Sequence, residues 1–470
     1  MFFRQRENAI RKAFSLALIF LVGGLPVCLQ AQTELAVNQT NEEKPVVVSE
    51  REVVKPLVVS VLPKYYNAQD GMTPAALINR ALQSNGELVA VRIEIEKARA
   101  RLQQARLRPN PTLEIEKSTG RIVGNGGDGE FSIGASLPLE LYGRRKTRIE
   151  VAEIEIRARE AEVANFERRV ANEVLLNYAE ALAALREIEV LERILELDLQ
   201  TTRFVQIRVN EGETAPLELN LLQTEIERLR SKKELAEGRL QSSLTKLKLL
   251  TDSPFDAPLL LREQITTAIL PQIPKTVETA VDVALRTRPD IQLAQIEEDL
   301  ATAGLRLIRA NSKPDFTAYT RYTQGRSVVD LPNGAFPQSD RTLTFGVSIG
   351  LPIFNKNQGA KTEAELTIKQ TQARREFAEK VIRSEVITAF QKYNAAQRAI
   401  WTLETSVIPR SEQNLDVFRR IYEIGEIKIT DLIAEQRRML DANRDLTEAL
   451  TERYRAQTEL LIALGTISFK

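Results

Sequence analysis

The sequence repeats one long pattern after an interval of a little over 200 residues. Three pairs of identical residues stand 213 positions apart: Gly212 and Gly425, Leu219 and Leu432, and Gln223 and Gln436. Solenoid repeats are much shorter, at roughly 20 to 50 residues. The sequence therefore predicts two copies of one supersecondary module, residues 72–250 and 276–466, joined by a connector at residues 251–275.

Each copy contains two segments in which apolar residues alternate with small or polar ones, which is the period of a β-strand. The predicted strands are residues 112–119 and 130–141 in the first copy, and residues 315–323 and 341–353 in the second. Residues 120–130 form the first connecting loop, and residues 324–340 form a longer one. The predicted fold class is α+β, with four strands in each chain.

The alternation by itself fits two kinds of sheet. The half-buried sheet of a soluble domain shows it, and so does a strand with one face toward lipid. The strands are about ten residues long, which is near the length that crosses a bilayer at a tilt. Four strands cannot close a barrel, and an open sheet edge is not viable in lipid. A membrane location therefore requires several chains to share one barrel.

Very long helices follow both strand pairs. Residues 144–211 contain neither Gly nor Pro, and residues 360–424 contain only Pro409, which should kink the helix or open a bulge. Gly212 and Gly425 can adopt the left-handed conformation that ends a helix, and the chain then turns back. The two predicted helical hairpins, with coiled-coil packing, are residues 143–250 and 357–466.

Residues 1–31 have the layout of a secretory signal, because basic residues precede an apolar run and Ala31 supplies a small residue for cleavage. An uncleaved anchor helix is the alternative, although the apolar run is short for a membrane span. Cys28 resembles the acylated cysteine of bacterial lipoproteins, so lipidation and removal with the signal both stay open. Residues 32–71 are predicted to be an extended segment of unassigned role.

Composition argues against catalysis and against nucleic-acid binding. The chain has a net charge of +1, no His and a single Cys. Without His, and without Cys28 if it is removed with the signal, the usual nucleophile–base pairs and soft metal sites are missing, so we expect no enzyme activity, cofactor or resident metal. A hydrolase that uses two carboxylates is the remaining enzyme alternative. The mixed charges give no basic face for nucleic acid.

The turn segments resemble those of the TolC family of outer-membrane efflux ducts. Tyr422-Glu423-Ile424-Gly425, followed by Thr430-Asp431-Leu432 and Gln436, is similar to the family's periplasmic tip motif. Glu211-Gly212, followed by Glu218, Leu219 and Gln223, resembles its partner in the first repeat. The strand-to-helix junctions at residues 137–145 and 351–359 most resemble the cobalt-zinc-cadmium resistance (CzcC-like) subgroup.

The resemblance, which covers residues 71–466, implies a homotrimer. Twelve strands would form a β-barrel in outer-membrane lipid, and the long helices would form a hollow α-helical barrel in the periplasm. The implied partners are a periplasmic adaptor (membrane fusion) protein and an inner-membrane RND-type pump. The implied function is passage of heavy-metal cations or drugs to the exterior. Multidrug efflux and type I protein secretion are alternatives within the family, and a periplasmic coiled-coil scaffold is an alternative of another class.

The resemblance also implies a gated periplasmic tip at Gly212, Glu218, Leu219, Gln223, Gly425, Lys428, Asp431, Leu432, Glu435 and Gln436. Three copies of Asp431 would form a ring that attracts cations, and the alternative role is a first-turn acid that stabilises its own helix. A second family acid is replaced by Ala434, and Glu435 faces another direction. Lys428 and Glu218 are expected to form a weak latch between neighbouring tips, unless Lys428 is an unpaired surface residue.

Overall fold

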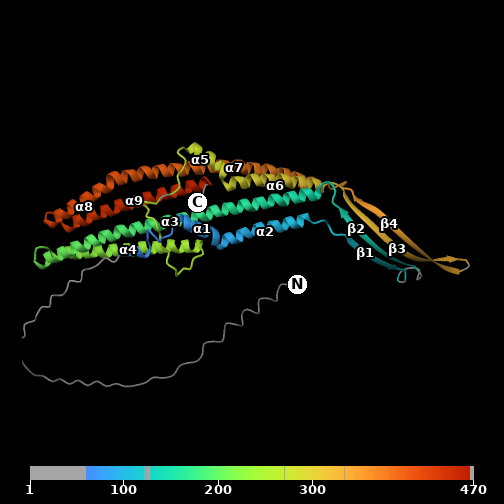
Figure 1. The fold of residues 1–470 in the computed structure, drawn as a ribbon, viewed down its shortest axis with the longest axis horizontal. Helices are drawn as coiled ribbons and strands as arrows, with labels where there is room; N and C mark the ends of the chain where they lie inside the picture. Colours follow the sequence, from blue (N-terminus) through green and yellow to red (C-terminus); the bar gives the residue numbers. More distant parts are fainter. Residues whose placement is uncertain (1–59, 121, 123–127, 269, 333, 466–470) are drawn as a thin grey trace, which may run out of the picture. The chain divides into compact units, whose positions relative to one another are not determined.

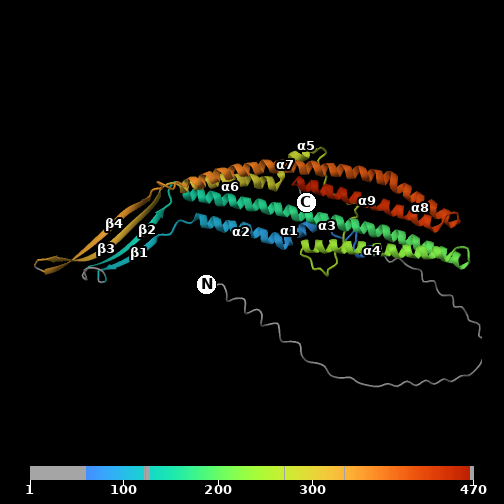
Figure 2. The ribbon, with the colours of Figure 1, turned by 180° about the vertical axis from the view of Figure 1, so that it is seen from behind.

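The computed structural model describes residues 60–120, 122, 128–268, 270–332 and 334–465, all within one compact unit. The predicted signal at residues 1–31, with Cys28 and Ala31, lies outside the described residues, as do residues 32–59 of the predicted extended segment. Within the unit, α3 lies between α4 and α9, and the sheet continues from one end of the helices (Figure 1, Figure 2).

The two repeats contain the same order of elements. The first consists of α1 (Pro74–Ser84), α2 (Gly86–Arg106), β1 (Thr112–Thr119), β2 (Gly129–Leu139), α3 (Arg144–Asn210) and α4 (Pro216–Leu250), after a short 3-10 turn, η1 (Leu62–Lys64). The second consists of α5 (Val277–Thr287), α6 (Pro289–Asn311), β3 (Asp315–Leu331), β4 (Gly334–Gly350), α7 (Gln358–Thr402), η2 (Leu403–Val407), α8 (Ile408–Glu423) and α9 (Ile429–Ala463). The predicted duplication of a helix, β-hairpin and long-helix module is confirmed.

Local sequence signals set where the helices begin. The hydroxyl of Thr73 accepts a hydrogen bond from the Ala76 amide at 3.2 Å, and Pro74 occupies the first helical position. Thr276 caps α5 in the same way. Asn85 separates α1 from α2, because its side chain caps α2 through the Leu88 amide at 3.0 Å.

The long helices follow the distribution of Gly and Pro. The 67 residues of α3 form one uninterrupted helix, which at 1.5 Å per residue is on the order of 100 Å long. In the second repeat, Pro409 lies just after the five-residue π-helical segment η2, which joins α7 to α8. Proline cannot donate the backbone hydrogen bond of a regular helix. The prediction of a local bulge near Pro409 is therefore confirmed.

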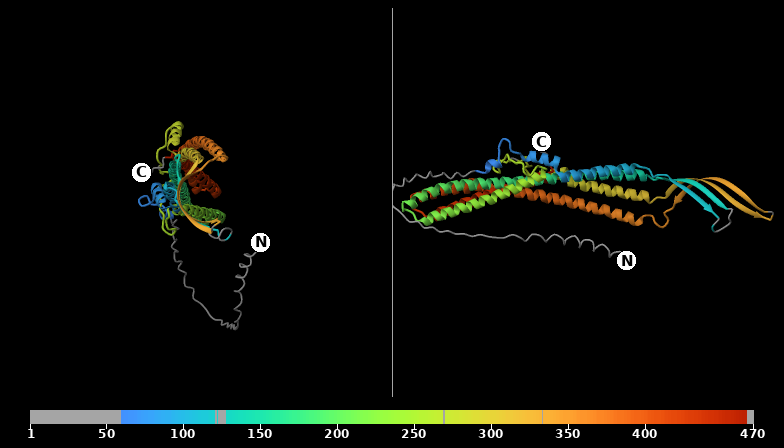
Figure 3. Two further views of the ribbon diagram at one scale, coloured as in Figure 1. Left: turned by 90° about the vertical axis from the view of Figure 1, so that its right-hand side faces the viewer. Right: turned by 90° about the horizontal axis from the view of Figure 1, so that it is seen from below.

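The four strands form one antiparallel sheet in the order β1-β2-β3-β4 (Figure 3). Each repeat supplies one hairpin, and β2 pairs with β3 to join the repeats. The predicted loop at residues 324–340 is wrong for most of its length, since residues 324–331 of β3 pair with residues 334–341 of β4. Backbone pairing needs no apolar alternation, so the two strands continue past the point where their side-chain pattern ends.

The other strand boundaries also differ from the prediction. β4 ends at Gly350 rather than at residue 353, and Pro352, two residues on, has no amide to donate. β2 ends at Leu139 rather than at residue 141, because Tyr142 (φ 56°) and Gly143 (φ 73°) turn the chain into α3. Pro337 is accommodated within β4, which is an edge strand of the sheet.

The described part of the predicted extended segment, residues 60–71, is bound to the helices. Glu192 of α3 accepts hydrogen bonds from Ser60 Oγ at 2.6 Å and from the Val61 amide at 2.9 Å. Tyr66 and Met72 form β-bridges to Leu261 of the connector. Among its described residues, the connector has no regular element apart from these bridges.

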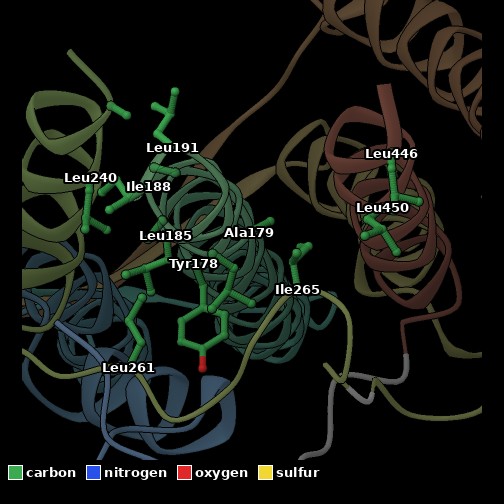
Figure 4. Packing of buried hydrophobic residues seen from close by; sticks show 14 of the residues in the cluster. Tyr178, Ala179, Leu185, Ile188, Leu191, Leu240, Leu261, Ile265, Leu446 and Leu450 are labelled. Atoms are coloured by element: carbon green, nitrogen blue, oxygen red, sulfur yellow. The ribbon is translucent and has the colours of Figure 1, made fainter. Parts of the chain in front are cut away.

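Two apolar clusters hold the helices together. In the larger one, Tyr178, Leu185 and Ile188 of α3 pack with Leu240 of α4 and with Leu261 of the connector (Figure 4). A second cluster joins α5, α6, α7 and the end of α9. None of the described helices is both long and apolar enough to cross a membrane.

Candidate functional site

Each helical hairpin ends in a turn centred on glycine. Gly212 ends α3 with φ 78°, and Gly425 ends α8 with φ 83°. The amide of Glu213 donates to the Arg208 carbonyl at 2.9 Å, and the amide of Glu426 donates to the Ile421 carbonyl at 3.2 Å. Both turns therefore close the last helical carbonyls in the Schellman pattern, where a left-handed residue is needed.

The two turns of one chain contact each other. The hydroxyl of Tyr422, near the end of α8, donates a 3.0 Å hydrogen bond to Glu218 Oε2 in the first turn of α4. Burial, and then the bond to Glu218, raise the pKa of Tyr422, so the hydroxyl stays protonated and available as a donor. A Cβ atom on Gly425 would lie 3.4 Å from Nη2 of Arg208, which places the α3 guanidinium against the second turn.

Lys428 and Asp431 form the start of α9. Asp431 Oδ2 accepts a hydrogen bond from the Lys428 amide at 3.2 Å, so this carboxylate closes the first turn of its own helix. Both side chains are exposed. Within the described part of the chain, no ion pair joins Lys428 to Glu218, whose partner is Tyr422. A latch between tips of neighbouring chains and a ring of Asp431 side chains both stay predictions.

The remaining predicted tip residues divide into buried and exposed ones. Leu219 and Leu432 are buried, and each belongs to the apolar cluster between the hairpins. Glu435 is buried and forms an ion pair with Arg438 on its own helix, whereas Asp431 is exposed. Gln223 is exposed, whereas its repeat counterpart Gln436 is 5% exposed. The two repeats therefore differ at this position.

Gln436 contacts a buried acid that sequence reasoning missed. Its Nε2 donates a 2.5 Å hydrogen bond to Oδ1 of Asp198, a residue of α3 that is 0% exposed. Burial raises the pKa of Asp198 to about 7, although the bond from Gln436 acts to lower it. The nearby carboxylate of Glu225 adds to the rise and is itself paired with Arg437 at 2.6 Å. A lone acid between Leu197 and Leu199 was the available sequence signal.

The sheet has one apolar and one polar face. The apolar face presents exposed Leu113, Ile115, Phe131, Ile133, Leu137, Leu343, Phe345, Val347 and Ile349. On the polar face, Arg321 of β3 pairs with Glu114 at 2.9 Å and with Glu116 at 3.0 Å, both on β1. Gly134 stands between Glu114 and Arg321 in register, so no side chain separates them. The polar face therefore carries a fixed charged cluster with two acids and one base.

The comparisons with known proteins agree with this architecture. Residues 77–252 and 280–466 match the family described as "Outer membrane efflux protein". The cobalt-zinc-cadmium resistance protein CzcC of Cupriavidus metallidurans is 24% identical over 414 residues, which cover 87% of this chain and 93% of that protein. The outer membrane protein TolC of Vibrio cholerae is 21% identical over 341 residues, which cover 72% of this chain and 77% of that protein.

Solved structures share the fold. The crystal structure of CusC has a TM-score of 0.70 at 22% identity and covers 83% of this chain and 92% of that chain. The outer membrane protein VceC of Vibrio cholerae has a TM-score of 0.66 at 18% identity and covers 83% of this chain and 96% of that chain. The resemblance stated from the sequence is thus confirmed, for a family of channel proteins rather than enzymes. The chain belongs to the outer membrane efflux protein family and is an outer-membrane channel for efflux.

Proposed function

We propose that three copies of this chain assemble into a duct that carries heavy-metal cations from an inner-membrane pump and a periplasmic adaptor to the cell exterior, without catalysing a reaction. The observation that carries the assembly is the open sheet. Among the residues that the structure describes, β1 and β4 are the edges of the sheet, each paired on one side only. Unpaired strand edges are not viable in lipid, and pairing β4 of one copy with β1 of the next removes all of them.

The two faces of the sheet support its orientation in the assembly. Phe345 is 74% exposed and Leu113 is 65% exposed in the single chain, which is costly in water and favourable in hydrocarbon. The opposite face carries Arg321 and its two acids, which need water or each other. The apolar face therefore meets lipid, and the polar face lines the passage.

The tip contacts support a gate at the far end of the helices. The bond between Tyr422 and Glu218 holds the two hairpins of one chain together at their turns. Opening the passage there requires the hairpins to move apart and this bond to break. Asp431 lies at the same end, exposed at the start of α9, where three copies would favour cations over anions.

The choice of heavy metals rests on the similarity to CzcC along nearly all of its length. The duct itself supplies carboxylates rather than soft ligands along the passage, so we assign the choice of metal to the pump and the adaptor. RND-type pumps and membrane fusion proteins are the classes of partner proposed. Growth of a strain without the gene, on zinc, cobalt, cadmium, dyes and detergents, tests the substrate: sensitivity to metals alone supports the proposal, and sensitivity to dyes alone refutes it.

Two adjacent residues of β4 provide a matched test of the assembly. Val347→Asp places a charge on the apolar face, and Ser348→Asp places the same charge on the polar face. A charge toward the bilayer midplane costs about 2 to 4 kcal/mol for basic residues and less for acids. Crosslinked trimers should be recovered from outer membranes for the wild type and for Ser348→Asp, and in reduced amount for Val347→Asp. Equal recovery of both variants, or a soluble wild-type monomer, contradicts the duct.

A further inference from the structure

Asp198 and Gln436 form a buried polar contact between the two helical hairpins. Asp198 belongs to α3 of the first hairpin, and Gln436 belongs to α9 of the second. They are 0% and 5% exposed, and the Gln436 Nε2 donates to Asp198 Oδ1 at 2.5 Å. The contact lies 12 residues before the end of α3, or about 18 Å along the helix axis from the tip turn.

Each side chain has one buried oxygen atom without a partner. These atoms are Oδ2 of Asp198 and Oε1 of Gln436. An ionised carboxylate and an amide oxygen are both acceptors, so neither can satisfy the other. Leaving two buried polar atoms unpaired is unfavourable, and native structures rarely do so. A proton on Oδ2 converts this atom into a donor, and a small rotation of the amide lets it donate to Oε1.

We propose that Asp198 is a proton-binding site that forms a reciprocal acid–amide pair with Gln436 and joins the two hairpins, and that loss of this proton loosens the joint and favours opening of the tip. The first half of the proposal concerns the chain alone. The second half rests on the proposed duct function. No covalent step is involved, because the proton is exchanged with water when the contact opens.

The charged groups around Asp198 favour its protonated, neutral form. On α4, Glu225 raises the pKa of Asp198, and burial is the larger cause of the rise to about 7. Glu225 is compensated by Arg437 of α9 at 2.6 Å and by Arg228 of α4 at 3.6 Å. Beside Gln436, Glu435 is paired with Arg438 on α9. On the α8 side, Glu412 pairs with Arg193 of α3 at 3.9 Å. No cation among these pairs is directed at Asp198 itself.

The direction of the pH dependence follows from the raised pKa. A carboxyl group has a pKa of about 3.9 in an unfolded chain, and that of Asp198 is about 7 in the folded protein. The folded state therefore holds a proton that the unfolded state releases. The contribution of this pair is fully present below about pH 4 and declines as the pH rises to about 7. Above that range, Asp198 is a buried carboxylate.

The repeat limits this site to one contact per chain. The positions that correspond to Asp198 and Gln436 in the other repeat, at the 213-residue offset, are Ser411 and Gln223. Ser411 has no titratable group in this pH range, and Gln223 is exposed. The proton site thus belongs to the contact between α3 and α9 and has no counterpart at the equivalent pair of positions.

Infrared spectroscopy of the detergent-solubilised protein tests the proton directly. The wild type should show the carbonyl band of a protonated carboxylic acid at about pH 6, and this band should titrate away near pH 7. Asp198→Asn should lack the band, and Asp441→Asn, which changes an exposed acid of α9, should retain it. A wild-type spectrum without such a band, or a band that persists in Asp198→Asn, overturns the assignment.

Two further variants should both move the titration to lower pH. In Gln436→Leu, the protonated acid loses the amide oxygen that accepts its proton in the proposed pair, so the band should disappear at lower pH. A shift to higher pH in this variant would show that Gln436 serves the ionised form only, through its donor bond, and would overturn the reciprocal pair. Glu225→Gln removes a charge that raises the pKa of Asp198, so the band should also disappear at lower pH. Both variants keep Asp198, so the test does not depend on the folding of Asp198→Asn. A midpoint that is unchanged in both variants contradicts the proposed pair.

Conductance in planar lipid bilayers tests the link to the tip. Mean wild-type conductance should rise severalfold between about pH 6 and about pH 8, as Asp198 loses its proton. Asp198→Asn can both donate and accept as the neutral acid does, so its conductance should stay low across this range, while Asp441→Asn should follow the wild type. Identical pH profiles for wild type and Asp198→Asn refute the link. No conductance in any protein refutes the duct, and the infrared titration then still decides the proton site.

Discussion

The hydroxyl of Tyr422 and the carboxylate of Glu218 form a hydrogen bond of 3.0 Å between residues 204 positions apart. The donor lies on α8 and the acceptor on α4, so the bond crosses from the second repeat to the first. Tyr422 is 2% exposed, and water therefore competes little for its hydroxyl. The sequence motifs place the two turns in separate segments of the chain. This hydrogen bond connects the two turns directly.

Tyr422→Phe should favour the open tip, because it removes the donor while keeping the ring. A hydrogen bond to a charged group contributes roughly 1.5 to 3 kcal/mol when buried, and Glu218 is only partly buried, so we expect a loss near 1 kcal/mol. The measurement is single-channel conductance, which should rise severalfold. Tyr393→Phe, on α7 and away from the turns, is the control and should conduct as the wild type does. A low, wild-type conductance in Tyr422→Phe would show that this bond is no part of the gate.

Two substitutions at Asp431 separate its two roles. Asp431→Asn retains an oxygen that can accept from the Lys428 amide, and Asp431→Ala removes it. We expect Asp431→Ala to lose about 0.5 to 2 kcal/mol of stability in denaturant unfolding. Asp431→Asn should lose little stability and yet show reduced cation selectivity, measured as the reversal potential in a salt gradient. If the reversal potential of Asp431→Asn equals that of the wild type, only the capping role survives.

The charged cluster on the polar face of the sheet should influence the ions that pass. The double variant Glu114→Gln, Glu116→Gln leaves Arg321 without its two partners, which changes the net charge of each cluster from −1 to +1. Three copies would turn an acidic ring into a basic one, and the permeability ratio of cations to anions should fall. Lys117→Gln, on the opposite face of the same strand, is the matched control. The reversal potential of the double variant should therefore differ from that of Lys117→Gln. Equal reversal potentials in these two proteins would show that the charged cluster does not line the passage.

Arg288 is the buried charge on which the start of the second repeat depends. It is 2% exposed and forms ion pairs with Asp290 and with Glu385 of α7. Arg288→Ala should cost about 3 kcal/mol, at the low end of the range for breaking a buried pair, since Glu385 loses this partner and Asp290 keeps only Arg168, at 3.6 Å, as an ion-pair partner. Arg286→Ala removes a 75%-exposed arginine of an ion pair and should cost less than about 1 kcal/mol. Denaturant unfolding of the two variants measures this contrast, and similar costs would contradict it.

Low pH should weaken the ion pair between Arg288 and Asp290. Burial acts to raise the pKa of Asp290, but the hydrogen bond and charge of Arg288 outweigh it and lower this pKa below its usual range. The contribution of the pair is therefore present above the unfolded pKa of about 3.9 and declines as the pH falls below it. In Arg288→Ala, the loss of stability relative to wild type should shrink at low pH. If the difference in stability between wild type and Arg288→Ala stays constant with pH, the ionisation of Asp290 does not contribute to it.

Features set by local sequence could be predicted with good boundaries. The end of α3 at Asn210 follows from Gly212, and the interruption after α7 follows from Pro409, because both depend on backbone conformation within one turn. The extent of the β3–β4 hairpin could not be predicted in this way. Its outer half is held by backbone pairing between polar segments, which leaves no apolar period in the sequence.

Contacts between distant residues were beyond the reach of the sequence. Asp198 and Gln436 are separated by 238 positions, and only the packing of α3 against α9 brings them together. The Gln436 position was identified from its motif, yet its partner carries no motif of its own. Lys428 and Glu218 were matched by their location near the turns, whereas the side chain that meets Glu218 within the chain is that of Tyr422.

Periodicity, caps and helix-ending glycines act over a few residues, so the duplicated module of strands and long helices could be derived from the order of the amino acids. Which polar groups are buried and which side chains meet could be learned only from the folded chain. Burial depends on how helices far apart in the chain pack together, and it is burial that turns Asp198 from an ordinary surface acid into a candidate proton site. The same packing made Gln436 its partner and left the repeat-related Gln223 in solvent.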